Sequence, residues 1–407
     1  MEISVFHIAD MHLGRRFQDH PEVADTLSEA RYKTLESLVS EANERQTDIM
    51  SVGGDLFDRR SMKKADVQRA AHILNRFTGK TALVLPGNHD YISEGAELWQ
   101  RFKEEAEDHI LLLQEAEPVS LETFGIDATV YPGPCRAKHS AENGIRWIKE
   151  VEKNREFIHI GIAHGSIEGV SPDFEQRYYP MTLEELKDAG VDIWLLGHTH
   201  ITWPENPDRR DFVFNPGTPE PDGFACRHPG RAFCISIDEN KEISAEILNC
   251  GLYRFRQRRE KLYTKEDIQK LEASLEEDEF RRVVLKLTVE GRLEPEVYEY
   301  WKERIPELRK AVLELKLDDG KLLRSITIEQ ISKEFPKDSL PEKLLSRFAE
   351  AGDSQALQRA YELIRRAQED NHTYKGGGSS LGASDTVSDT VSEKSDENRN
   401  SRKGGEV

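Results

Sequence analysis

Five short stretches of this sequence end an apolar run in side chains that commonly bind metal ions. They are ADMHLG with Asp10 and His12, SVGGDLFD with Asp55 and Asp58, ALVLPGNHD with Asn88, His89 and Asp90, HIGIAHGS with His164, and IWLLGHTH with His198 and His200. Imidazole, carboxylate and amide ligands without a thiolate favour Mn²⁺, Fe²⁺ or Zn²⁺. One such motif alone is often only a capped turn, but the five together predict a metal centre.

Predicted strands and amphipathic helices alternate over the first two-thirds of the chain. The strands are expected at residues 3–9, 48–52, 81–85, 128–131, 157–163, 191–196, 212–214 and 232–237, and the helices at 24–45 and 64–77. This alternation is typical of an α/β fold, and open sheets of that kind bind ligands where their strands end. Each metal-type motif follows a predicted strand, which agrees with a ligand site at the strand ends.

The order of the motifs, D-x-H, GD-x-x-D, GNH, H and GH-x-H, resembles the calcineurin-like metallophosphoesterases. The forms ADMHLG, GDLFD, PGNHD and the later NPGTPE are similar to the bacterial SbcD type, a branch of DNA double-strand-break repair nucleases. The resemblance covers residues 1–240. It implies an α/β fold with a two-sheet core, a β-sandwich flanked by helices, and metal-dependent hydrolysis of phosphodiesters at DNA ends.

The same resemblance implies a site for two divalent metal ions, with Mn²⁺ expected. One ion would be held by Asp10, His12, Asp55 and His200, and the other by Asp55, Asn88, His164 and His198. Asp55 would then bridge the two ions, and His89 matches the catalytic histidine of the family. Two ions about 3.5–4 Å apart can activate water and clamp a phosphodiester.

Several residues beside the motifs keep more than one interpretation. Some members of the nuclease branch carry His at the position of Asp58, so this residue is expected to lie in a loop or behind the ligands. Asp90 either orients the His89 ring or caps a turn. Four arginines after the motifs either position a phosphate backbone or are solvated, namely Arg15, Arg16, Arg59 and Arg60.

Two further histidines and one loop have simpler interpretations. His7 and His159 lie inside predicted strands and are expected to be core residues with satisfied hydrogen bonds. NPGTPE, Asn215 to Glu220, is expected to form a rigid turn near the site.

Changes in composition along the chain predict four regions. Residues 1–250 are expected to form the nuclease domain, and residues 251–335 a small α+β capping module that orients DNA. The basic run at 254–261 either lines one face for DNA or is solvated. Residues 336–373 are expected to be a helical segment that docks a partner. The Gly/Ser-rich residues 374–407 are expected to be disordered.

Charge, cysteine and hydropathy exclude several protein classes. The net charge of −19 argues against broad coating of nucleic acid, so any DNA contact must be local. Four cysteines without C-x-x-C spacing are expected to be reduced core thiols and not a zinc ribbon. The chain has no apolar stretch near the ~18 residues of a membrane span and no signal-peptide pattern, so a cytoplasmic protein without membrane contact is expected.

Three hypotheses for function follow. The leading one is a nuclease subunit that acts on DNA ends, for which the resemblance implies a homodimer and an SbcC- or SMC-like ATPase partner. The second is a phosphoesterase that acts on nucleotides or phosphoproteins, although such an enzyme needs no module after residue 250. The third is a scaffold that mainly binds the ATPase, although a scaffold has no need of His89.

Overall fold

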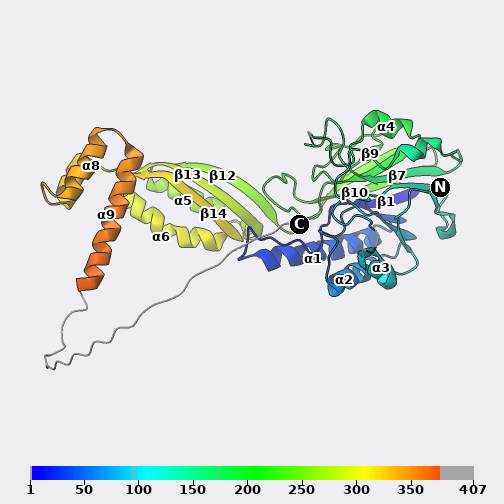
Figure 1. Cartoon of the computed structure of the whole chain (residues 1–407), viewed down its shortest axis with the longest axis horizontal. Helices are drawn as coiled ribbons and strands as arrows, with labels where there is room; N and C mark the ends of the chain where they lie inside the picture. Colours follow the sequence, from blue (N-terminus) through cyan, green and yellow to red (C-terminus); the bar gives the residue numbers. More distant parts are fainter. Residues whose placement is uncertain (1, 94, 96, 174, 376–407) are drawn as a thin grey trace, which may run out of the picture. The chain divides into compact units, whose positions relative to one another are not determined.

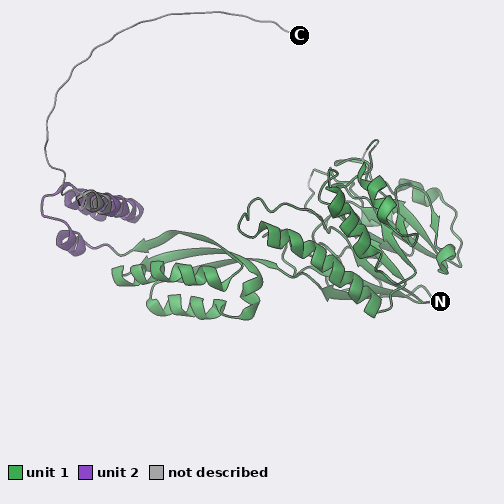
Figure 2. Ribbon diagram, turned by 90° about the horizontal axis from the view of Figure 1, so that it is seen from below, with its two compact units in different colours: residues 1–325 green, residues 326–407 purple. Residues whose placement is uncertain are grey.

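The computed structural model of the chain describes residues 2–93, 95, 97–173 and 175–375 (Figure 1). Two compact units make up the chain, residues 1–325 and 326–407 (Figure 2). The expected disordered tail, 374–407, lies outside the described residues except for its first two positions. Among the helices of the described part, none combines the length and the apolar character that crossing a membrane requires.

The first unit contains a six-stranded sheet with the order β11-β10-β1-β2-β3-β4. β1 to β4 are parallel, β10 pairs antiparallel with β1, and β11 pairs antiparallel with β10 at the edge of the sheet. The strands are β1 (Ile3–Ile8), β2 (Ile49–Val52), β3 (Thr81–Val84), β4 (Ile110–Leu112), β10 (Arg231–Ile237) and β11 (Ile243–Asn249). The helices of this half are α1 (Ala24–Glu44), α2 (Lys64–Leu74) and α3 (Glu97–Glu105).

A five-stranded sheet with the order β5-β6-β7-β8-β9 forms the second half of the core. β6 to β9 are parallel, and β5 pairs antiparallel with β6. The strands are β5 (Val119–Ser120), β6 (Ala128–Gly133), β7 (Ile158–His164), β8 (Ile193–Gly197) and β9 (Val213–Phe214). The short helix α4 (Leu183–Asp188) begins at a capping box, in which Thr182 and Glu185 satisfy each other's backbone N–H groups.

The two sheets pack face to face, because side chains alternate along each strand. Val5 of β1 belongs to an apolar cluster with Ile160 and Leu195 of the second sheet. Phe6 and Ile8 point the other way, into a second cluster with the apolar faces of α1, α2 and α3. This α/β architecture, with two sheets and flanking helices, confirms the expected fold class.

His7 joins the two sheets inside this core. The side chain is fully buried. Its Nε2–H donates to the Leu196 carbonyl of β8 at 2.9 Å, and its Nδ1 lies 3.2 Å from the Ser51 hydroxyl of β2. His159 is also buried, and its ring bonds the Tyr131 hydroxyl and the Asn154 carbonyl. Both histidines are therefore satisfied core residues, as the sequence predicts.

A module of alternating strands and helices follows the core within the first unit. Its elements are β12 (Arg254–Leu262), α5 (Lys265–Leu275), the 3-10 turn η3 (Asp278–Arg282), β13 (Val283–Leu293), α6 (Pro295–Ala311) and β14 (Glu314–Arg324). The three strands pair in parallel in the order β12-β13-β14. The basic run predicted at 254–261 is thus an edge strand, and the helices supply the crossovers that parallel strands need.

The second unit is a three-helix cluster of α7 (Ile328–Glu334), α8 (Leu340–Glu350) and α9 (Ser354–Lys375). Asp353 caps α9 by accepting the Ala356 N–H at 3.0 Å. Leu345 and Leu357 pack against Ile331 of α7. This unit starts at Ile326, before the helical segment expected from residue 336, because α7 shares the apolar core of the two helices that follow.

Acid should weaken the core at His7. Burial lowers the pKa of His7 from 6.5 to about 4, so the native imidazole stays neutral while the unfolded one takes up a proton below pH 6.5. The contribution of neutral His7 to the free energy of unfolding is therefore complete above pH 6.5. It is lost as the pH falls toward 4, by about 3 kcal/mol in total. Urea unfolding of chelator-treated protein at pH 7.5 and 5 measures this loss.

The loss should be smaller in His7→Gln, which does not titrate, than in the wild-type protein. His72→Gln is the control, because the His72 side chain is 61% exposed. Equal pH dependence in wild type and His7→Gln would contradict the assignment.

Candidate metal centre

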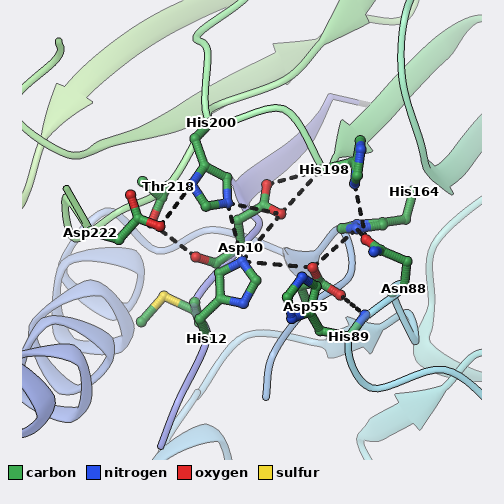
Figure 3. Close-up of polar contacts among 12 residues, drawn as sticks. Asp10, His12, Asp55, Asn88, His89, His164, His198, His200, Thr218 and Asp222 are labelled. Atoms are coloured by element: carbon green, nitrogen blue, oxygen red, sulfur yellow. Dashed lines mark hydrogen bonds and ion pairs between the residues drawn. The ribbon is translucent and has the colours of Figure 1, made fainter. Parts of the chain in front are cut away.

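The five motifs meet at neighbouring strand ends of the two sheets (Figure 3). Asp10 and His12 follow β1, Asp55 follows β2, and Asn88 follows β3. His164 is the last residue of β7, and His198 and His200 follow β8. These side chains are buried or nearly so, apart from His198 and His200, which are partly exposed. Residues separated by up to 190 positions thus share one site, as the parallel strand order requires.

The backbone at the site is held in an uncommon conformation. Asp10, His12 and Asp55 have positive φ angles of 57°, 45° and 53°, and His198 has one of 101°. Such angles are costly for residues with a Cβ atom and are typical of functional sites. The glycines of the motifs leave the space that the ligands need, since a Cβ on Gly54 would lie 2.0 Å from His164 Nδ1 and one on Gly87 would lie 2.2 Å from Asp55 Oδ1.

One group of candidate ligands consists of Asp10, His12, Asp55 and His200. His12 Nε2 and His200 Nε2 face each other at 3.1 Å. Both nitrogens also face Asp10 Oδ1, at 4.0 and 3.8 Å. The distance from His12 Nε2 to Asp55 Oδ2 is 3.6 Å. The imidazole nitrogens and carboxylate oxygens of these four residues therefore converge on one another.

The second group consists of Asp55, Asn88, His164 and His198. Asn88 Oδ1 lies 3.0 Å from His164 Nε2 and 2.9 Å from His198 Nδ1. His164 Nε2 is 3.4 Å from Asp55 Oδ2, the same oxygen that faces His12. The other oxygen, Oδ1, accepts the backbone N–H of His89 at 2.8 Å. Asp55 is thus the residue common to both groups.

The charges of the site depend on Asp55. Burial opposes ionisation of Asp55, but His164 and His12 outweigh it and hold the pKa of the carboxyl well below its usual range. Burial likewise opposes the charge on His164, and the Asp55 carboxylate raises the pKa of His164 to about 9. Burial and the neighbouring His164 lower the pKa of His198 to about 3. The ionised Asp55 carboxylate therefore lies between the imidazole groups of His12 and His164.

The residues of the two groups fit divalent first-row ions. Ligand atoms that bind one such ion at about 2.0–2.2 Å are themselves roughly 3 Å apart, which matches the contacts of His12 with His200 and of Asn88 with two histidines. Among the residues that the structure describes, three groups of His and Asp side chains have ligand atoms that all lie within 4.8 Å of one another inside each group. These groups are Asp10/His12/His200, His12/Asp55/His89 and Asp10/Asp55/His164. The mixed nitrogen and oxygen donors suit Mn²⁺, Fe²⁺ or Zn²⁺.

His89 lies beside the two groups and is partly exposed. Its ring packs edge-on against the His12 ring, with 4.8 Å between the ring centroids. Its Nδ1–H donates to the Asp58 carbonyl at 3.0 Å. Asp90 does not orient the ring, because its carboxylate accepts the N–H groups of Gly87 and Phe57 at 2.7 and 2.9 Å. Of the two interpretations of Asp90, the structure shows the turn cap.

Asp58 and the arginines near the motifs have specific neighbours. Asp58 Oδ1 is 3.8 Å from His12 Nδ1, behind the ligand nitrogen. Arg15 lies 3.8 Å from the Asp58 carboxylate, and Arg59 lies 3.5 Å from it. Arg60 donates to the Tyr91 hydroxyl at 2.8 Å, whereas Arg16 is exposed. Three of these four arginines therefore help to hold the loops beside the site.

Three residues outside the predicted set of ligands support the site from behind. The Asp222 carboxylate lies 3.2 Å from His200 Nδ1 and 3.3 Å from Arg15. The Thr218 hydroxyl donates to the Asp10 carbonyl at 2.9 Å. Arg31 of α1 is fully buried and donates to the Met11 carbonyl at 2.6 Å. The NPGTPE turn is thus close to the site, as predicted.

Only part of this support has a sequence signal. Asp222 lies two residues past NPGTPE, so extending that motif would have found it. Arg31 has no such signal, because a single arginine in an amphipathic helix is usually solvated. Its role depends on the turn between Asp10 and His12 reaching α1, which only the folded chain shows.

Comparison with known proteins adds independent information about the same residues. Residues 3–202 match the family model described as calcineurin-like phosphoesterase. The uncharacterized metallophosphoesterase YhaO of Bacillus subtilis (strain 168) is 27% identical over 207 residues, which cover 49% of this chain and 49% of the relative. The DNA double-strand break repair protein Mre11 of Methanopyrus kandleri is 24% identical over 243 residues, 53% of this chain and 48% of that protein. The chain spans about half the length of these curated relatives.

A solved structure, the calcineurin-like phosphoesterase YfkN from Bacillus subtilis, covers 61% of this chain and 91% of its own, with 12% identity and a TM-score of 0.38. The family model covers all five motifs up to His200, the last candidate ligand. Those motifs supply the two groups of candidate ligands around Asp55. Through residues 3–202, this chain belongs to the calcineurin-like metallophosphoesterase superfamily.

Proposed function

We propose that this protein is a metal-dependent phosphodiesterase that hydrolyses DNA, of the SbcD-type branch of double-strand-break repair nucleases. The observation that carries the proposal is the pair of ligand groups that share Asp55, with His89 beside them. Asp10, His12, Asp55 and His200 would hold one ion, and Asp55, Asn88, His164 and His198 the other. When bound, two divalent ions, Mn²⁺ in this proposal, activate water and offset the charge of a phosphodiester.

His89 has the geometry of a proton donor. Because Nδ1–H donates to the Asp58 carbonyl, the ring has a fixed orientation, and Nε2 is the nitrogen left for substrate. The protonated ring can donate from Nε2 to an oxygen of the scissile phosphate or to the leaving group. His89 also belongs to one of the three ligand-like sets, so a test must separate donation from metal binding.

Asp222 has the geometry of a residue that positions His200. His200 faces His12 and Asp10 with Nε2, and its Nδ1 faces Asp222. A carboxylate on the far nitrogen fixes both the ring orientation and the tautomer of a metal-binding histidine. Arg15 approaches the same carboxylate at 3.3 Å, so Asp222 also ties the loop after His12 to the site.

DNA as the substrate rests on the motif forms, on one set of relatives and on the appended module. A relative named DNA double-strand break repair protein Mre11 aligns over 243 residues of this chain. Nucleotides and phosphoproteins are the alternative substrates, and they are compared with DNA in the test below. The homodimer implied by the family resemblance stays a prediction.

The second unit is proposed to dock an SMC-like ATPase. Its helices expose large apolar side chains outside the cluster that holds them together, with Leu340 79% exposed and Leu363 66% exposed. In helix-in-groove contacts, exposed apolar side chains of one helix pack into an apolar groove of the partner.

Purified protein with Mn²⁺ should hydrolyse linear duplex DNA, and chelator should abolish the reaction. The Asp55→Asn variant should lose most activity and bind both metal ions more weakly, because a neutral amide cannot balance the charge of two cations as a carboxylate does.

The His89→Ala variant should keep both metal ions and still bind DNA, but it should cleave DNA about 10²-fold or more slowly. Elemental analysis, DNA binding and cleavage rates measure these effects.

Two results would contradict these assignments. Full activity with two bound ions in Asp55→Asn would remove its bridging role, and loss of an ion in His89→Ala would make His89 a ligand. Hydrolysis of nucleotides or phosphoproteins without cleavage of DNA would overturn the DNA assignment and favour the alternative substrates.

Asp222→Ala should weaken binding of one Mn²⁺ ion by about 10–100-fold and leave the other unchanged. The reason is that His200 belongs to only one of the two ligand groups. Calorimetric titration of metal-free protein with Mn²⁺ resolves the two ions. Asp208→Ala is the control, because its side chain is 51% exposed. Wild-type affinity for both ions in Asp222→Ala would show that His200 needs no positioning.

The double variant Leu340→Ser/Leu363→Ser should lose co-purification with the ATPase and keep Mn²⁺-dependent cleavage of short DNA. Exposed side chains contribute little to folding, so thermal unfolding should change little. The control is Leu183→Ser, a leucine of α4 in the first unit that is 42% exposed. Undiminished co-purification of the double variant would move the docking site elsewhere.

A further inference from the structure

The Asn88 side chain of the second group has two chemically different ends. Only its amide oxygen can bind a metal ion, because the NH₂ group is a donor of hydrogen bonds. Oδ1 is the end that faces His164 Nε2 and His198 Nδ1, at 3.0 and 2.9 Å (Figure 3). Nδ2 donates to the Lys138 carbonyl at 3.4 Å. A carbonyl accepts only from the NH₂ end, so Lys138 selects the orientation of Asn88 that suits a metal ligand.

The loop that contains this carbonyl runs beside the Asn88 segment. We call residues 135–140, which follow β6, the positioning loop. Its first residue, Cys135, is fully buried. The Cys135 N–H donates to the Pro86 carbonyl at 3.1 Å, and the Cys135 carbonyl accepts the Ile92 N–H at 3.0 Å. The start of the positioning loop is thus joined to the chain on both sides of Asn88.

A buried tyrosine holds the next part of the positioning loop. The Tyr179 hydroxyl accepts the N–H groups of Arg136 and Ala137 at 3.1 and 2.8 Å, and it donates to the Ala137 carbonyl at 2.9 Å. The Tyr179 N–H donates to the Ser140 carbonyl, at the end of the loop, at 2.9 Å. Only 7% of Tyr179 is exposed. One hydroxyl therefore makes three hydrogen bonds to the backbone directly before Lys138.

The backbone of Tyr179 is itself fixed against the residue that follows His164. Its φ angle is +52°, a conformation that is costly for a residue with a Cβ atom and needs support from its surroundings. A Cβ atom on Gly165 would lie 2.3 Å from the Tyr179 carbonyl oxygen, so this close approach requires a glycine. Tyr179 therefore has a fixed position relative to His164, and its hydroxyl fixes the positioning loop relative to the same ligand.

The preceding residue, Tyr178, contacts another ligand of the second group. Its ring lies against the His198 ring, with 4.9 Å between the centroids and 32° between the planes. Its backbone N–H donates to the Asp173 carboxylate at 3.0 Å, which fixes this turn of the chain. The two consecutive tyrosines thus support the second group, whereas Asp222 lies behind His200 of the other group.

We propose that Tyr179 is a positioning residue for the metal ion of the second group. Its hydroxyl holds the positioning loop so that the Lys138 carbonyl turns Asn88 Oδ1 toward the two histidines. The inference rests on the proposed two-ion site. Replacing residues that orient metal ligands typically changes metal affinity by about 10–100-fold. Tyr179 supports the second group as Asp222 supports the first.

The test is Tyr179→Phe in the full chain, which keeps the ring and removes the hydroxyl with its three hydrogen bonds. The matched control is Tyr131→Phe, because Tyr131 is also buried and its hydroxyl bonds the His159 ring at 3.0 Å. Neither Tyr131 nor His159 belongs to a ligand group. Metal-free proteins are titrated with Mn²⁺ by calorimetry, and Asp222→Ala is measured in the same series.

The Tyr179→Phe variant should bind one Mn²⁺ ion about tenfold more weakly than the wild-type protein. This should be the ion whose affinity Asp222→Ala leaves unchanged. The Tyr131→Phe variant should bind both ions as the wild-type protein does. A general loss of stability would not select one ion, so complementary losses in Tyr179→Phe and Asp222→Ala report the positioning of ligands.

A further variant tests whether Tyr179 acts through Asn88. In Asn88→Asp, both terminal atoms of the side chain are oxygens, so the Lys138 carbonyl no longer selects the ligand atom. Two residues that act through one contact show non-additive effects when both are replaced. Adding Tyr179→Phe to Asn88→Asp should therefore change the affinity for Mn²⁺ by less than about twofold.

Three results would overturn this inference while the two-ion site stands. They are wild-type affinity for both ions in Tyr179→Phe, loss of the same ion that Asp222→Ala weakens, and an undiminished effect of Tyr179→Phe in the Asn88→Asp background. A wild-type protein that binds fewer than two Mn²⁺ ions would instead overturn the two-ion proposal, and this inference with it.

Discussion

The Asp55 carboxylate, shared by two groups of ligand atoms, is the constraint on which the rest of the site depends. One of its oxygens faces His12 and His164 from opposite sides, and the other is fixed by the His89 backbone N–H. A buried anion of this kind is tolerated only where cations or imidazoles compensate it. The two sheets must therefore bring β2 and β7 together at the same end, and the positive φ of Asp55 is part of that cost.

The support of the site is distributed over distant segments. Asp222 and Thr218 come from the loop before β10, and Arg31 comes from α1, yet all three contact the residues around Asp10, His12 or His200. The segment after His12 then continues into the apolar contact with β12 and β13. The turn that carries Asp10 and His12 thus leads directly into the segment that packs against the module.

The family and the function have different kinds of support. The superfamily rests on a family model over residues 3–202 and on ligand groups that the folded chain assembles. The proposal of DNA as the substrate rests on the motif forms and on partial similarity to proteins named as Mre11. One superfamily fold supports several phosphoesterase reactions, so the substrate must be decided by the surfaces around the metal centre.

The sequence by itself determined the α/β order, the strand ends that carry ligand-type residues and the burial of His7, because period-two alternation and short motifs are local properties. Helix α3 and strand β11 have no expected counterpart, since tertiary packing stabilises such short elements. Only the tertiary structure decided that Asp90 caps a turn, that Asp222 and Arg31 support the ligands, and which residues of β12 face solvent. These depend on strand register and on contacts between residues far apart in sequence, which local patterns do not encode.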